Sequence, residues 1–100
     1  MEFTTDQAGE ALRVKISGVL TFDDHDRFKA IIKMVSNGEE NDIVLDLSGT
    51  KMIDSAGIGM LLLANDKASK QSKKLSLTGV SGHVAKVIEL SKVDQIIPIV

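Results

Sequence analysis

The part of the sequence best suited to chemistry is an acid and a serine in front of an apolar run. Residues 51–66 have the sequence KMIDSAGIGMLLLAND, in which Asp54 and Ser55 precede the run. A serine at a helix start accepts hydrogen bonds from the free amides of the first turn, and the helix dipole favours an acid there. Gly57 and Gly59 follow, although each glycine costs a helix about 1 kcal/mol relative to alanine. The pattern predicts Ser55 as the N-cap of a helix whose backbone can be approached closely.

Apolar residues around this serine favour a docking surface with a modifiable centre. Met52, Ile53, Ile58 and Met60 surround the predicted helix start. Nucleophilic catalysis by Ser55 would need a base, and the segment offers no histidine or lysine in a matching position. The alternative interpretation is structural: serine is a common N-cap, and glycines also permit tight packing of a helix against a sheet.

The remaining motifs give no support to a cofactor or metal site. The Gly57–Gly59 pair lacks the third glycine of a dinucleotide fingerprint, and it is not a phosphate-binding loop. His25 and His83 are far apart in the sequence, and cysteine is absent. The lysines in residues 67–74 stand at a helix end, where the dipole favours them, and are expected to form a solvated face. We therefore expect no cofactor, no metal and no small-molecule substrate.

The rest of the chain alternates between strand and helix patterns. Residues 11–17 alternate between apolar and polar side chains, which predicts a strand with one wet face. Phe28, Ile31, Ile32 and Val35 follow the spacing of one apolar helical face. Caps are expected from Asp23 or Asp24, from Asn37-Gly38 at the helix end and from Ser81 further on. The expected strands are 11–17, 42–49, 73–79 and 95–100, with a further one at 2–7, and the expected helices are 23–38, the apolar run after Ser55, and 81–92.

This alternation predicts an α/β fold with a mixed, mainly parallel β-sheet of four to five strands packed against helices. The apolar run at 42–49 is expected to be a central strand, with Val44 buried in it. Pro98 should confine the last strand to an edge or place it near its end. In open sheets of this class, function concentrates in loops at the carboxyl ends of strands, which is where Asp54 and Ser55 lie.

Composition excludes several classes of partner. The chain has 100 residues, which predicts a single domain, and its net charge of −2 gives no basic excess for nucleic acid or an anionic membrane. Three aromatic residues are too few for a base-stacking platform. No apolar run approaches the roughly 18 residues of a transmembrane helix. We expect a cytoplasmic protein without nucleic-acid or membrane partners.

The segment DIVLDLSGTKMIDSAGIGMLLLAND resembles the signature of the STAS domain, the domain of bacterial anti-sigma factor antagonists with relatives in sulfate transporters. That signature is an apolar strand ending in Asp-Leu, a spacer, Asp-Ser-x-Gly-(Leu/Ile)-Gly and a leucine-rich helix. Here Asp46-Leu47 ends the strand, and residues 54–59 supply the Asp-Ser motif. The order of elements matches along the whole chain, residues 1–100.

The resemblance implies a binding module with no catalysis of its own, in which Ser55 is phosphorylated. It also implies two partners: a serine kinase or anti-sigma factor with the histidine-kinase-like ATPase fold, and a phosphatase of the PP2C type. The unphosphorylated form would bind its partner, and phosphate would block binding. The partner-binding residues would be Asp23, Asp24, Met52, Asp54, Ser55, Ala56, Gly57, Ile58 and Gly59.

One position departs from the family pattern. Thr21 stands where an aspartate often follows the strand-ending glycine by three residues. The loop FDDHDRF also resembles single-domain STAS regulators whose output is biofilm or motility, so this output and control of a sigma factor both stay open. Two further alternatives are a STAS scaffold subunit of a transporter or stress-sensing complex, in which Ser55 is only a cap, and a small enzyme or nucleotide binder.

Overall fold

After an opening pair of strands, helices and strands alternate along the chain from the first α-helix to the third. The computed structural model describes residues 1–100 apart from the side chain of Ala8. Two short 3-10 helices, η1 and η2, accompany the main elements. In chain order the elements are β1 (Glu2–Ala8), β2 (Ala11–Leu20), η1 (Phe22–Asp24), α1 (His25–Asn37), β3 (Asp42–Ile53), α2 (Ser55–Lys70), β4 (Lys74–Thr78), α3 (Gly82–Leu90) and η2 (Val93–Gln95).

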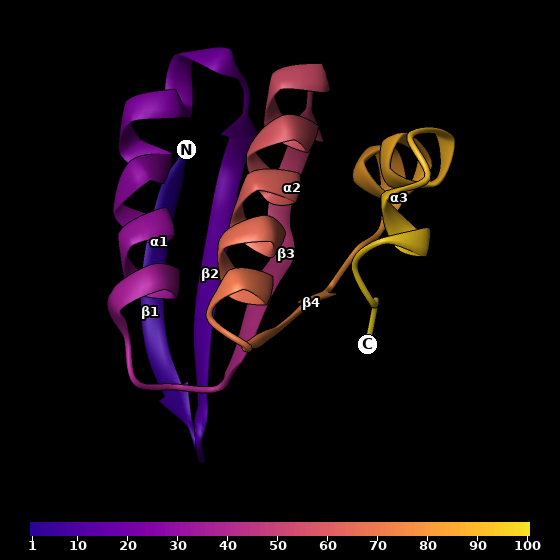
Figure 1. Ribbon diagram of the computed structural model, residues 1–100. Helices are drawn as coiled ribbons and strands as arrows, with labels where there is room; N and C mark the ends of the chain where they lie inside the picture. Colours follow the sequence, from indigo (N-terminus) through magenta and orange to yellow (C-terminus); the bar gives the residue numbers. More distant parts are fainter.

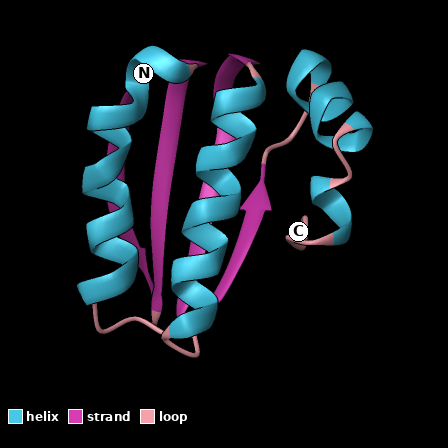
Figure 2. Ribbon diagram, turned by 45° about the horizontal axis from the view of Figure 1, so that its top comes forward, coloured by secondary structure: helices cyan, strands magenta, loops and turns pink.

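The sheet has four strands in the order β1-β2-β3-β4. β1 runs antiparallel to β2, whereas the β2–β3 and β3–β4 pairs are parallel. Helices α1 and α2 lie side by side over one face of this sheet, and α3 stands beyond β4 (Figure 1, Figure 2). The expectation of a mixed, mainly parallel sheet packed against helices is therefore confirmed.

The core lies between the sheet and the two side-by-side helices. Burial of their apolar faces drives this packing, at about 25 cal/mol per Å² of apolar surface. Helix α3 packs against β3 and adds Val84 and Ile88 to the core. The fully buried larger side chains include Val14, Ile16, Phe28, Ile31, Leu45, Leu47, Leu61 and Leu77.

Strand β3 is central, as predicted, but it is longer than the predicted 42–49. Its extension pairs with the end of β2, from Ser17 opposite Gly49 to Leu20 opposite Ile53. This pairing brings the start of α2 next to the loop that follows β2. The expectation for Val44 needs correction, because its side chain is only partly buried while that of Leu45 is fully buried. Successive strand residues face opposite sides, and α1 and α2 cover one of them.

The predicted C-terminal strand at 95–100 is wrong. Its first residue belongs to η2, and the later residues contribute only an isolated bridge between Ile99 and Leu77. The Leu77 amide donates to the carbonyl of Pro98 at 2.9 Å, and the Val100 amide donates to the carbonyl of Leu77 at 2.8 Å. Pro98 has no amide to donate to a ladder, so the segment lies along the outer edge of β4 without extending the sheet.

Several expected caps differ in detail. Asp24 and Ser81 occupy the N-cap positions of α1 and α3, but neither side chain makes a capping hydrogen bond there. Gly38 does follow the end of α1, with an extended backbone. Lys73 does not belong to a solvated face, because its ammonium donates to the carbonyls of Val35 and Gly38 at 2.7 and 2.5 Å. These are carbonyls at the end of α1, where a cation is favourable.

Candidate functional site

Asp54, rather than Ser55, caps helix α2. One carboxylate oxygen of Asp54 accepts a hydrogen bond from the Gly57 amide at 2.8 Å. The other accepts from the Phe22 amide at 3.4 Å, and the Asp54 amide donates to the carbonyl of Leu20 at 3.2 Å. The prediction that Ser55 is the N-cap is therefore wrong, because Asp54 has the extended backbone that the cap position requires and Ser55 is already helical.

Ser55 is the first residue of α2 and is exposed. Its hydroxyl makes no hydrogen bond with the residues that the structure describes. Because Asp54 satisfies the Gly57 amide, the helix start does not depend on the Ser55 side chain. The hydroxyl is therefore accessible, and the cap of α2 does not depend on it.

The two glycines of the first turns have different environments. A Cβ atom on Gly57 would lie 2.4 Å from the carbonyl oxygen of Leu20 and 2.6 Å from Cγ1 of Ile53. Real Cβ atoms do not approach so closely, so Gly57 allows α2 to pack directly on the end of β2. A Cβ atom on Gly59 would meet nothing within 4 Å. Internal packing therefore explains Gly57 and leaves Gly59 unexplained.

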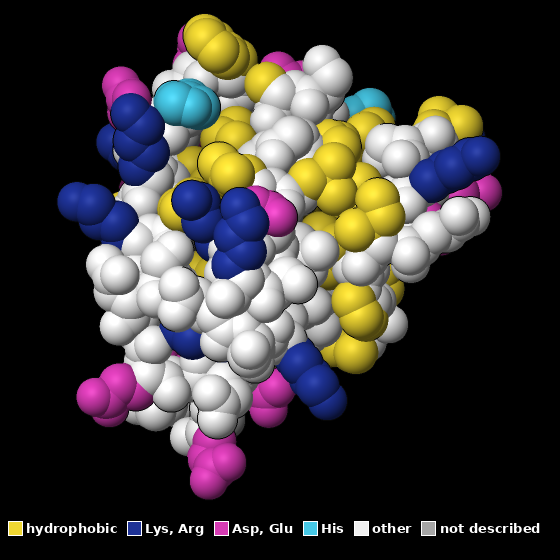
Figure 3. Space-filling view, in the orientation of Figure 1, with side chains coloured by type: hydrophobic (Ala, Val, Ile, Leu, Met, Phe, Trp, Pro, Cys, Tyr) yellow, Lys and Arg dark blue, Asp and Glu magenta, His cyan; other side chains and the backbone are white. Residues whose placement is uncertain are grey.

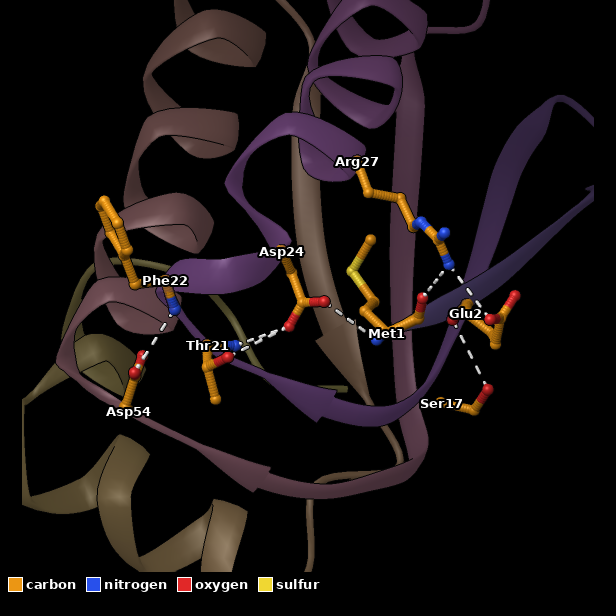
Figure 4. A network of polar contacts seen from close by, with 8 residues as sticks. All are labelled: Met1, Glu2, Ser17, Thr21, Phe22, Asp24, Arg27 and Asp54. Carbon is orange, nitrogen blue, oxygen red and sulfur yellow. Dashed lines mark hydrogen bonds and ion pairs between the residues drawn. The ribbon is translucent and has the colours of Figure 1, made fainter.

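The loop between β2 and α1 lies beside this helix start, as Figure 4 shows. A carboxylate oxygen of Asp24 accepts from the Thr21 amide at 2.9 Å, and the Asp24 amide donates to the Thr21 carbonyl at 2.9 Å. Burial raises the pKa of Asp24, but hydrogen bonds from Thr21 and from the amino group of Met1 outweigh it and lower the pKa below its usual value. Thr21 and Asp24 thus close the loop together, and the hydrogen bonds from Thr21 favour the carboxylate form of Asp24.

Exposed apolar side chains and an apolar groove lie near the start of α2. Phe22 is 70% exposed and Met52, at the end of β3, is 43% exposed, and the Phe22 backbone is bonded to the cap residue Asp54. A groove of about 360 Å³ runs between α2 and α3. Figure 3 shows apolar side chains gathered in this region between the two helices. The groove is lined by Ile53, Asp54, Ser55, Ile58, Val87, Leu90 and Ser91.

The structure brings most of the predicted partner-binding residues together. The stretch from Met52 to Gly59 forms the end of β3 and the first turns of α2, although Gly57 and Ile58 are themselves buried. Asp24 is partly buried within the neighbouring loop, and Asp23 beside it is exposed. Three apolar residues near this surface were not among the predicted ones, because tertiary packing brings them there: Phe22, Val87 and Leu90. Only Phe22 carried a local signal, as an aromatic residue in a polar loop.

Asp46, the other acid of the family signature, has a separate structural role. It lies seven residues before the end of β3, about 20 Å along an extended strand. Asp46 is buried and accepts hydrogen bonds from Arg13 at 2.6 Å and from the Ser48 amide at 2.9 Å. Burial raises its pKa, but the Arg13 guanidinium and the Ser48 hydrogen bonds outweigh this effect and lower the pKa to about 2. Asp46 therefore ties β2 to β3 as a carboxylate.

Within residues 1–100, leaving the Ala8 side chain aside, no three histidine or acidic side chains are grouped so that they could hold a metal ion. In the same part of the chain, none of the helices has the length and apolar character needed to cross a bilayer.

Solved structures with this fold include an anti-sigma factor antagonist, a cell fate determinant and a sulfate transporter family protein. An anti-sigma factor antagonist from Mycobacterium paratuberculosis matches with a TM-score of 0.87 and 18% identity, over 98% of this chain and 83% of that chain. The phosphorylated form of the Bacillus cell fate determinant SpoIIAA matches with a TM-score of 0.73 and 18% identity, over 99% and 91%. A sulfate transporter family protein from Wolinella succinogenes gives a TM-score of 0.75 and 21% identity, over 87% and 70%. At these identities the similarity shows the fold.

Sequence comparison identifies the family. A STAS-domain containing protein of Pseudomonas aeruginosa strain UCBPP-PA14 is 31% identical over 91 residues, which cover 91% of this chain and 89% of that protein. The family model described as "Mlab, STAS domain" matches residues 3–99. With the Asp-Ser motif at the start of α2 and the fold described above, these matches show that the chain belongs to the STAS domain family.

Proposed function

We propose that this protein is a phosphorylation-switched binding module in which Ser55 accepts the phosphate. The observation that carries the proposal is the exposed Ser55 hydroxyl at the first residue of α2, next to a cap that Asp54 supplies. A kinase can reach this hydroxyl, and its modification leaves the cap in place. The similarity to an anti-sigma factor antagonist and to a cell fate determinant solved in its phosphorylated form supports the proposal.

The unphosphorylated protein binds its partner through the surface around Ser55. Met52 and Phe22 supply exposed apolar contact area, and Gly59 leaves the helix backbone open to close approach. A phosphate adds a charge of about −1.5 to −2 at the centre of this surface, beside the carboxylate of Asp54. The free protein tolerates that charge at a helix N-terminus, whereas a partner surface that must exclude water there does not.

The proposed partners are those of a partner-switching system. A serine kinase or anti-sigma factor with a histidine-kinase-like ATPase fold binds and phosphorylates the protein, and a PP2C-type phosphatase removes the phosphate. The chain performs no catalysis in this scheme and acts in the cytoplasm as a single STAS domain. Its output is control of a sigma factor, or of biofilm formation or motility.

Mass spectrometry of the protein purified from its own host tests the modification. We expect a species heavier by one phosphate, with the phosphate on Ser55. Ser69 and Ser72 are also exposed and provide internal controls. Phosphate on either of these, with Ser55 unmodified, would contradict the proposal.

Titration calorimetry against a candidate serine kinase of the proposed class tests the switch. Ser55→Asp should lower the affinity more than tenfold, because an unpaired charge desolvated in a complex costs at least about 2 kcal/mol. Ser55→Asn has nearly the same shape without the charge and should bind like the wild type. Ser55→Ala should also bind, and its melting temperature should barely change because Asp54 supplies the cap. Equal affinities of the Asp and Asn variants would refute the electrostatic switch.

A second candidate is a non-phosphorylated STAS scaffold subunit of a transporter or a stress-sensing complex. The specific observation in its favour is the similarity to a sulfate transporter family protein. In that case Ser55 would carry no phosphate in the host, and transporter or stress-complex subunits would co-purify with the protein. The mass measurement and the identity of the co-purified proteins therefore distinguish the two candidates.

A further inference from the structure

The loop that displays Phe22 is connected to the cap of α2 by one side-chain hydrogen bond. Within the loop, the Thr21 amide is satisfied by Asp24. The Phe22 amide, in contrast, donates to Asp54, the residue directly before Ser55 (Figure 4). Asp54 therefore contacts both the phosphoacceptor helix and the loop that carries the most exposed aromatic side chain near the site.

The two hydrogen bonds of the Asp54 carboxylate differ in length. The bond from Gly57 is 2.8 Å long and that from Phe22 is 3.4 Å long. Donor–acceptor distances for strong N–H···O bonds lie near 2.9 Å, so the bond to Phe22 is the weaker of the two. A perturbation of the carboxylate should break this bond first and spare the cap.

Negative charge on residue 55 is such a perturbation. A phosphate there repels the adjacent Asp54 carboxylate. We propose that Asp54 transmits the phosphorylation state of Ser55 to the β2–α1 loop by releasing the Phe22 amide. This inference rests on the proposed phosphorylation of Ser55. It adds a second effect of the phosphate, a loosening of the β2–α1 loop, to the direct repulsion of the partner.

Release of the Phe22 amide matters for binding because a pre-ordered loop loses less conformational entropy on association than a loose one. Phe22 is 70% exposed and its ring stacks only on His25, with ring centroids 6.2 Å apart. The position of the ring therefore depends on the backbone of the loop. Phosphorylation would weaken binding both by direct repulsion and by loosening this apolar contact.

Water-exchange NMR of the Phe22 amide tests the coupling without any partner. Ser55→Asp and Ser55→Asn are compared, because the two side chains share a shape and differ in charge. We expect the Phe22 amide to exchange about twofold faster in the Asp variant, the effect of losing one hydrogen bond at the weak end of the usual range of net strengths. The Gly38 amide, bonded to Met34 at the end of α1, serves as a reference and should not change.

The same pair of substitutions in an Asp54→Asn background isolates the role of the carboxylate. Without the charge of Asp54, the difference in Phe22 exchange between Ser55→Asp and Ser55→Asn should disappear. Equal Phe22 exchange in the first pair, or the same difference in both backgrounds, would overturn the inference. If Ser55 is phosphorylated in the host and Phe22 does not respond, the proposed function stands and the coupling fails. If Phe22 responds but no phosphate is found on Ser55, the coupling stands and the proposed function fails.

Discussion

Alanine at the two glycines of α2 should have opposite effects on stability. At Gly59 the added methyl group meets nothing within 4 Å. The exchange then gains the helix propensity of alanine, about 1 kcal/mol in a helix interior. For a domain of this size, 1 kcal/mol shifts the melting temperature by about 4–8 °C. We expect Gly59→Ala to melt about 5 °C above the wild type.

At Gly57 the methyl group would meet the Leu20 carbonyl oxygen at 2.4 Å and Ile53 Cγ1 at 2.6 Å. The carbonyl belongs to β2 and accepts the hydrogen bond of the Asp54 amide, so it cannot move away without weakening that bond. Overpacking of this kind costs about 3 kcal/mol, from which the propensity of alanine subtracts about 1 kcal/mol. A net loss of about 2 kcal/mol lowers the melting temperature by about 10 °C.

Thermal melts followed by circular dichroism, with urea titrations alongside, measure both variants. A shift of the same sign in both would refute the distinction between the two glycines. Calorimetry of Gly59→Ala against the candidate kinase then measures whether the substitution also changes the binding affinity. A more stable protein that binds more weakly would indicate that the bare backbone at Gly59 serves a partner.

Three further expectations concern the fold. Leu45→Ala should lose about 3 kcal/mol in urea denaturation, as expected for a fully buried leucine, while Val44→Ala, on the side of β3 away from α1 and α2, should lose under 1 kcal/mol. The pKa of Asp46 is lowered to about 2. The carboxylate of Asp46 therefore contributes fully to stability above about pH 4, and this contribution is lost as the pH falls toward about 2. Asp46→Asn should flatten this part of the profile of stability against pH, and an unchanged profile would contradict the role of Asp46 in tying β2 to β3. Lys92 has a left-handed backbone, with φ of 63°, so Lys92→Gly should raise the melting temperature by a few degrees, whereas Lys86→Gly in the helical part of α3 should lower it.

Local patterns were sufficient for most of the fold. The alternation in residues 11–17 and the apolar spacing from Phe28 to Val35 depend on which side of a single element faces the core, and this is encoded every two or every three to four residues. The motif that identifies the family is also a contiguous segment, so its match required no tertiary information. The prediction of a C-terminal strand was wrong because Pro98 has no amide to donate to a ladder. The segment therefore makes only an isolated bridge at the edge of β4.

Tertiary structure decided the roles of individual residues at the site. The sequence placed Asp54 and Ser55 at a helix start, but backbone geometry determined which of them is the cap. The sequence does not distinguish Gly57 from Gly59. Only the close approach of the Leu20 carbonyl shows that Gly57 is required for packing, whereas the backbone at Gly59 is open. The contact between Phe22 and Asp54 joins residues 32 positions apart. Such contacts depend on the pairing of β2 with the long β3, which no local pattern encodes, because periodicity indicates which face of an element is buried and not which distant segment covers it.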